Sequence, residues 1–198
     1  MPRPKPKKIQ IDVDGVLADF AYGFTRLRNQ FLPEAEPVLP QSVQQVWEEC
    51  SDNAVPGNKE TWGDIRDSLY FWEELPALAT DEEFQRMRDL MWGNDVYFVT
   101  AREGYRAKQQ TEAWLRLNGI PNATVVMTAN KAAFMRIVGI THAIDDHPLF
   151  VRDMALVTGT SVYLKDMPYN QEWDALSAGV LRVPSLTAFL DIVTADGQ

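Results

Sequence analysis

The fold of this chain is decided by the stretch Lys8-Ile9-Gln10-Ile11-Asp12-Val13-Asp14-Gly15-Val16-Leu17-Ala18-Asp19-Phe20, in which a short apolar strand runs directly into two carboxylates and a glycine. Side chains alternate between the faces of a strand, so Asp12 and Asp14 project from the same side. Two like charges held this close need a cation between them or a proton on one of them. Gly15 allows the chain to turn sharply. Taken alone, the motif is equally consistent with an Asp-Gly hairpin turn.

The composition is that of an ordinary globular protein of one domain, or of a core with an inserted subdomain. The chain has 198 residues, of which 45% are hydrophobic, enough to bury a sizeable interior. A net charge of -9 argues against a nucleic acid polymer or an anionic membrane as partner. A single cysteine, Cys50, and two histidines, His142 and His147, argue against a disulfide framework and a zinc site. We expect a cytoplasmic protein, and the sequence leaves a homodimer open.

Strands alternate with helices through the second half of the chain. Apolar runs predict strands at 96–100, 124–127, 141–144 and 161–164, and apolar residues at helical spacing predict helices at 107–118, 130–138 and 186–193. Such alternation favours right-handed crossovers. We therefore expect an α/β fold with a Rossmann-like parallel sheet and helices on both faces.

The segment between the first two strands predicts a small helical cap. Phe20, Phe24, Leu27 and Phe31 recur at helical spacing, and residues 59–72 are rich in aromatic side chains. Val43, Val46 and Trp47 suggest a further short helix. We expect a disordered basic tail at 1–7, a core at 8–19 and 91–198, and a cap at 20–90.

Polar residues follow the successive strands. Asp12 and Asp14 come after the first strand, Thr100 after the second, Lys131 just past the third, and Asp145 and Asp146 after the fourth. Ligands of parallel sheets bind beyond the carboxyl ends of the strands. Any one of these residues could be a helix cap or a solvated surface group, but their order at four consecutive strand ends predicts a site.

This order of motifs resembles the haloacid dehalogenase superfamily over nearly the whole chain. Within it, the opening segment resembles the deoxyribonucleotidase branch, as do Tyr70-Phe71-Trp72-Glu73-Glu74-Leu75-Pro76, Asp145-Asp146-His147-Pro148 and Pro168-Tyr169-Asn170. The sequence departs from the animal enzymes at Ala101-Arg102, where they carry Ser-Pro. The resemblance implies hydrolysis of nucleoside monophosphates, with base and sugar preference undetermined.

The resemblance also implies roles that the chemistry supports. Asp12 would attack phosphorus to give an aspartyl-phosphate, and Asp14 would act as general acid and base. Thr100 and Lys131 would bind the transferring phosphoryl group. Mg²⁺ would be held by Asp12, the backbone carbonyl of Asp14 and Asp145.

The expected substrate is a small phosphomonoester. The residues predicted to contact it are Phe20, Phe71, Trp72, Ala101, Arg102 and Asp146, with the aromatic side chains stacking on a base. Asp146 could instead orient Lys131 or a metal-bound water, Arg102 could instead pair with Glu103 or with the acidic helix, and the aromatic residues could instead form the core of the cap.

Two alternatives remain beside a nucleotidase. One is a phosphatase for another small phosphorylated metabolite, and the other is a metal-bound binding protein without turnover. Asp14 favours a phosphatase over a dehalogenase, because a halide leaves without a proton.

Overall fold

The computed structural model describes residues 5–32, 50 and 52–195, and within them six strands form one fully parallel sheet. The sheet order is β3-β2-β1-β4-β5-β6. The strands are β1 (Lys8–Ile11), β2 (Asp95–Thr100), β3 (Thr124–Met127), β4 (His142–Asp145), β5 (Ser161–Lys165) and β6 (Leu181–Val183). The predicted parallel sheet is confirmed, and β6 is an addition that the sequence pattern did not predict.

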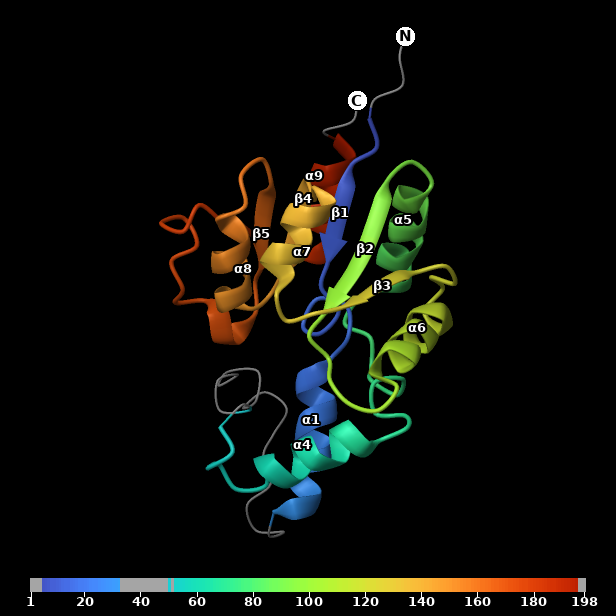
Figure 1. Ribbon diagram of the computed structural model, residues 1–198, viewed down its shortest axis with the longest axis vertical. Coiled ribbons are helices and arrows are strands. Elements are labelled where there is room, and N and C mark those ends of the chain that lie inside the picture. The colour runs from blue at the N-terminus through green and yellow to red at the C-terminus, as the bar shows by residue number, and fades with distance from the viewer. Residues whose placement is uncertain (1–4, 33–49, 51, 196–198) are drawn as a thin grey trace.

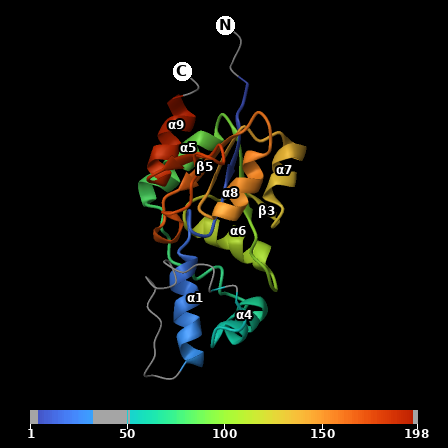
Figure 2. The ribbon, with the colours of Figure 1, turned by 90° about the vertical axis from the view of Figure 1, so that its left-hand side faces the viewer.

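Helices cover both faces of the sheet. They are α5 (Asp81–Met91), α6 (Ala107–Leu117), α7 (Lys131–Val138), α8 (Pro148–Ala155) and α9 (Leu186–Ala195). In Figure 2, α5 and α9 lie on one side of the strands, and α7 and α8 on the other. Every crossover is long enough for the right-handed connection that parallel strands require.

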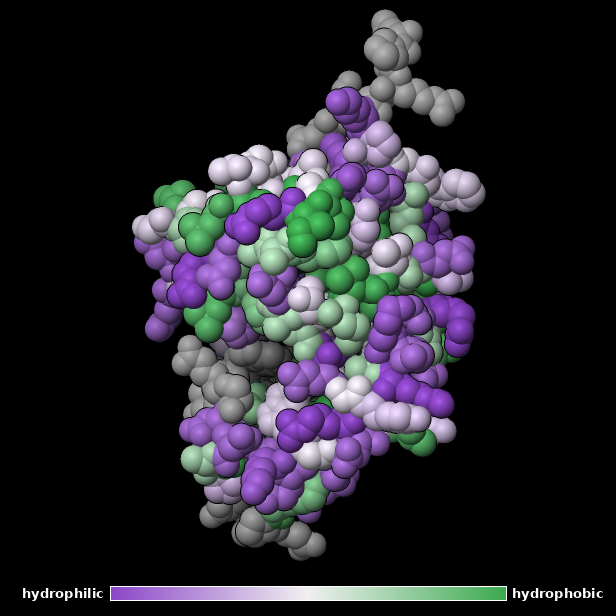
Figure 3. Space-filling model, in the orientation of Figure 1, coloured by the Kyte–Doolittle hydropathy of each residue, from purple (hydrophilic) through white to green (hydrophobic). Residues whose placement is uncertain are grey.

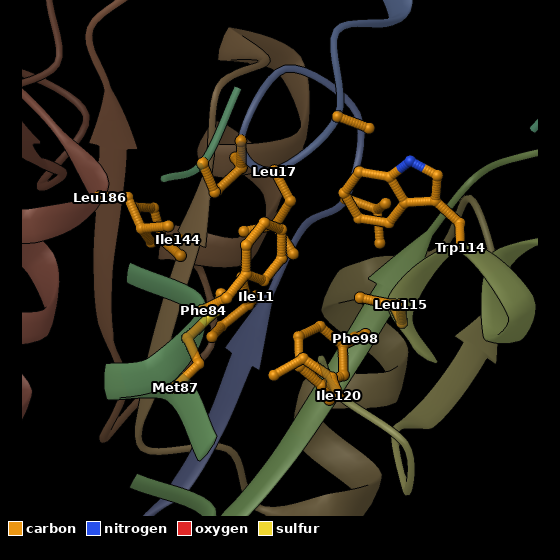
Figure 4. Close-up of a cluster of buried hydrophobic side chains, with 14 of the residues drawn as sticks. Ile11, Leu17, Phe84, Met87, Phe98, Trp114, Leu115, Ile120, Ile144 and Leu186 are labelled. Carbon is orange, nitrogen blue, oxygen red and sulfur yellow. The ribbon is translucent and has the colours of Figure 1, made fainter. Parts of the chain in front are cut away.

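The larger core lies on the face covered by α5, α6 and α9. Figure 4 shows Phe84 and Met87 of α5 beside Ile11 of β1, and Phe98 of β2 beside Leu115 and Ile120, with Trp114 of α6 nearby. These side chains are at most 2% exposed. A second cluster, which includes Met135 of α7 and Met154 of α8, fills the opposite face.

A helical cap lies at the carboxyl ends of the strands. It contains α1 (Phe20–Arg28), the 3-10 turn η1 (Asn29–Phe31) and α4 (Asn58–Asp67). Figure 1 shows α1 and α4 below the sheet, at the end to which the arrowheads of β1 and β2 point. This confirms the expected cap after the first strand. The range 20–90 assigned to it also contains α5, but α5 packs on β2 and α9, in the layer that covers the sheet.

Some expectations fall outside the described residues. The helix suggested by Val43, Val46 and Trp47 lies there, as do residues 1–4 of the expected tail. At Lys7 the backbone N–H already donates to Asn94 Oδ1 at 2.9 Å.

The surface carries both polar and apolar groups. The face seen in Figure 3 shows hydrophobic residues mainly over its upper part and mostly hydrophilic ones around α4. In the part of the chain that the structure describes, no helix combines the length and apolar character needed to cross a bilayer.

Candidate active site

Asp12 follows β1 directly and is buried at the carboxyl end of the central strand. Its backbone N–H donates to the Ile144 carbonyl at 3.1 Å, which extends the pairing of β1 with β4. Its carboxylate accepts from Val13 N at 2.7 Å. Burial and the charge of Asp145 raise the pKa of Asp12 to about 7, against the opposing effect of Lys131.

Lys131 joins two of the predicted carboxylates. It is the first residue of α7, behind the N-cap Asn130, and its side chain is only 1% exposed. Nζ lies 2.8 Å from Asp12 Oδ1 and 2.6 Å from Asp145 Oδ2. Burial alone would lower the pKa of Lys131, but the two carboxylates raise it above its usual value. The ammonium is therefore charged and held beside Asp12.

Asp146 is held by residues that follow β5. The Tyr169 hydroxyl donates to Asp146 Oδ2, and Asn170 Nδ2 donates to the Asp146 carbonyl at 2.8 Å. Gly15 has a φ of +78°, and a Cβ there would overlap the Asp146 carboxylate. The glycine is thus required both by its backbone conformation and by this close approach. Burial and the charges of Asp12 and Asp145 raise the pKa of Asp146 well above its usual range.

Asp14 is oriented by Thr100 and Arg102. Thr100 Oγ1 donates to Asp14 Oδ2 at 3.2 Å. Arg102 donates through Nε at 2.9 Å and through Nη2 at 2.8 Å, while its Nη1 donates to Thr111 Oγ1 at 3.0 Å. The guanidinium also lies 4.8 Å from the centre of the Trp72 ring. Of the contacts proposed for Arg102 from the sequence, neither Glu103 nor the acidic helix is its partner in the structure.

Three buried carboxylates could hold a metal ion. Asp12, Asp145 and Asp146 each offer an oxygen within 4.8 Å of the others. Lys131 contacts two of them, and burial and mutual repulsion raise the pKa values of Asp12 and Asp146, so a divalent cation could replace protons in this cluster. The predicted ligands Asp12 and Asp145 belong to this group. Asp146 belongs to it as well, although it was not predicted as a ligand. The Asp14 carboxylate is bound to Arg102, and coordination of Mg²⁺ by the Asp14 backbone carbonyl stays a prediction.

A cavity of about 430 Å³ opens over this cluster. The predicted residues that line it include Asp12, Asp14, Phe20, Trp72, Thr100, Ala101, Arg102, Lys131 and Asp146. Phe71 lies outside the lining and packs edge-on against Trp72, with ring centres 4.9 Å apart.

The predicted aromatic slot has a different geometry. Phe20 stacks on Trp72, with ring centres 5.7 Å apart, and on Trp62, with ring centres 5.6 Å apart. Phe20 is 3% exposed and Trp72 is 2% exposed. These two rings therefore pack mainly against each other and their neighbours, and little of either is open to a base.

In the part of the chain that the structure describes, six further lining residues were not predicted: Asn53, Trp62, Arg66, Glu103, His147 and Phe150. Trp62 and Phe150 are half-buried, so their rings have exposed surface in the cavity. Trp62 belongs to the aromatic-rich segment, which gave a signal without singling it out. Arg66 gave no signal, because a lone arginine on a polar helix is ordinary.

Comparisons with known proteins show what this architecture is similar to. The sequence matches no protein-family model and no curated protein. A predicted phosphatase from Clostridium acetobutylicum is 14% identical, with a TM-score of 0.64 and coverage of 97% of this chain and 100% of that one. A putative haloacid dehalogenase-like hydrolase from Burkholderia xenovorans is 13% identical, with a TM-score of 0.62 and coverage of 97% and 98%. The L-2-haloacid dehalogenase from Xanthobacter autotrophicus is 13% identical, with a TM-score of 0.56 and coverage of 96% and 98%. The chain thus has the fold of haloacid dehalogenase-like hydrolases, and the nucleotidase branch stays a prediction.

Proposed function

We propose that this protein is a Mg²⁺-dependent phosphomonoesterase that works through an aspartyl-phosphate on Asp12. The observation that carries the proposal is the position of Asp14, whose carboxylate lines the same cavity as Asp12 and is held by Thr100 and Arg102. The site thus combines a nucleophile with a separate group for proton transfer. An alkoxide needs a proton to leave, whereas a halide does not, so this pair favours phosphate ester hydrolysis over dehalogenation.

The donor set fits Mg²⁺. Asp12, Asp145 and Asp146 offer hard carboxylate oxygens close together, and Mg²⁺ prefers such ligands. When bound, the ion would neutralise charge on the phosphoryl oxygens and so favour attack by an anionic nucleophile. The mutual repulsion of the carboxylates, which raises the pKa values of Asp12 and Asp146, supports a cation at this place.

Two steps follow from the side chains. In the first, which Asp14 enters in its protonated form, an Asp12 oxygen forms a bond to phosphorus as the bond from phosphorus to the leaving oxygen breaks, and Asp14 gives that oxygen its proton. In the second, Asp14 takes a proton from water as the water oxygen bonds to phosphorus and the bond from phosphorus to the Asp12 oxygen breaks, which releases inorganic phosphate and restores free Asp12 and protonated Asp14. Lys131 binds the phosphoryl oxygens as a fixed positive charge, and Thr100 positions Asp14.

We propose nucleoside monophosphates as the substrates. A cavity of about 430 Å³ has the size of a small-molecule site. The half-buried rings of Trp62 and Phe150 line it and offer surface on which a base could stack. A phosphatase for another small phosphorylated metabolite is the second candidate, because Arg66, Asn53 and Glu103 add polar groups that a sugar phosphate could also use.

Turnover of p-nitrophenyl phosphate with Mg²⁺ and with EDTA tests the reaction class. We expect release of nitrophenol with Mg²⁺ and its loss with EDTA. A panel of nucleotides and sugar phosphates then tests the substrate class. Absence of turnover on every phosphomonoester tried with Mg²⁺ would favour a binding protein without catalysis and contradict the proposal.

A further inference from the structure

The cap contributes an aromatic ring and a cation to the cavity from one helix face. Trp62 and Arg66 are four residues apart on α4, so their side chains lie on the same face of the helix. Both line the cavity. Trp62 is fixed by its stacking on Phe20 and by donation from Nε1 to the Cys50 carbonyl at 2.6 Å.

The backbone of Arg66 is anchored to the core. Its carbonyl accepts from Tyr105 N at 2.6 Å. Gly104, with a φ of +108°, packs so closely that a Cβ there would lie 2.6 Å from the Arg66 Cα and carbonyl oxygen. The loop that makes these contacts also carries Arg102. The backbone of Arg66 is therefore fixed where the cap meets the loop that carries Arg102.

Within the described residues, Arg66 is also a cation of the cavity whose charge is not matched by an ion pair with a carboxylate. Lys131 pairs with Asp12 and Asp145, and Arg102 pairs with Asp14. Among the described residues, no carboxylate forms an ion pair with Arg66, although Glu103 shares the cavity lining. A guanidinium presents a planar fork of donors that matches a phosphate or a carboxylate.

We propose that Arg66 binds a second anionic group of the substrate. The preferred substrates are then phosphomonoesters that carry a further phosphate or carboxylate away from the phosphoryl group that is removed. This inference rests on the proposed function. Trp62 would contact the part of the molecule between the two anions.

The test compares kcat/KM for matched substrates in the wild type and in Arg66→Gln. One pair is a nucleoside 5'-monophosphate and the corresponding 3',5'-bisphosphate, which tests a second phosphate. The other is glycerol 3-phosphate and 3-phosphoglycerate, which tests a carboxylate. The wild type should prefer the doubly anionic member of at least one pair by about fivefold, the effect of a well-formed exposed ion pair. Arg66→Gln should lose this preference, and the preference of the wild type should shrink as salt rises.

Two controls separate the possible failures. Lys59→Gln removes a cation from the same helix outside the cavity lining and should keep the preference. Turnover of p-nitrophenyl phosphate should be similar in the wild type and in Lys59→Gln. Equal preference in the wild type and Arg66→Gln, or none in the wild type, would overturn the role of Arg66 while leaving the phosphatase intact. Absence of p-nitrophenyl phosphate turnover in the wild type would instead count against the proposed function.

Discussion

Replacement of Arg102 by methionine should destabilise the protein, because it removes the partner of a largely buried carboxylate. The Arg102 side chain is 0% exposed and that of Asp14 is 16% exposed. Removing one member of a buried ion pair costs about 3–5 kcal/mol, since the remaining charge loses its partner without regaining full hydration. Water can reach part of Asp14, so we expect a loss of about 3 kcal/mol in the free energy of unfolding.

Urea unfolding of the metal-free protein measures this loss. The matched control is Arg86→Met, which breaks a pair between Arg86 and Asp191 whose side chains are 27% and 66% exposed; it should cost less than about 1 kcal/mol. Adding Asp14→Asn to Arg102→Met should recover part of the loss, because the double variant leaves no unpaired charge at this position. If Arg102→Met costs no more than Arg86→Met, the reasoning about this buried pair is refuted.

Three further predictions concern the metal, the cap and the pH dependence. Activity lost in EDTA should return with Mg²⁺ or Mn²⁺. Ca²⁺ should inhibit, because its longer bonds and higher coordination number would engage a second oxygen of Asp12. Equal activity with Ca²⁺ and Mg²⁺ would contradict this role of Asp12. Trp72→Ala should lower the free energy of unfolding by about 3–5 kcal/mol in a thermal or urea melt, because Trp72 is a buried aromatic residue. Trp62→Ala should instead lower kcat/KM for nucleotides by about tenfold, the low end of base–aromatic stacking, and leave p-nitrophenyl phosphate turnover nearly unchanged. Equal losses on both substrates would argue against stacking. The affinity for Mg²⁺ should fall as pH falls from 8 to 6, because Asp12, whose pKa is about 7, must lose its proton to bind the ion; a calorimetric affinity independent of pH in this range would contradict the assignment of Asp12 as a ligand.

The sheet and the strand-end residues could be predicted because both follow from local pattern. Continuous apolar runs such as 96–100 are typical of buried parallel strands, and the carboxyl ends of such strands meet at one edge. Asp12 and Lys131 were therefore expected near one another, and their charged groups lie 2.8 Å apart. β6 was missed because three residues that include an arginine give too short a pattern.

The packing partners could not be predicted. Phe84 and Met87 give α5 an apolar face, but such a face is equally consistent with packing on the sheet, as observed, and with packing in the cap. The same limit applies to Phe20 and Trp72, whose aromatic character fits a ligand slot as well as a core, and whose stacking on one another depends on how the cap docks. Arg102 had several plausible partners in sequence, and tertiary structure placed Asp14 within its reach.

The aspartyl-phosphate on Asp12 is the central claim, and trapping it is the most direct test. The protein would be mixed with a radiolabelled phosphomonoester and Mg²⁺, quenched in acid within the first turnover, and digested to locate the labelled peptide. We predict label on the peptide that contains Asp12 in the wild type, and none in Asp12→Asn, whose amide cannot attack phosphorus. Label that persists in Asp12→Asn, or label on a different residue of the wild type, would contradict the account.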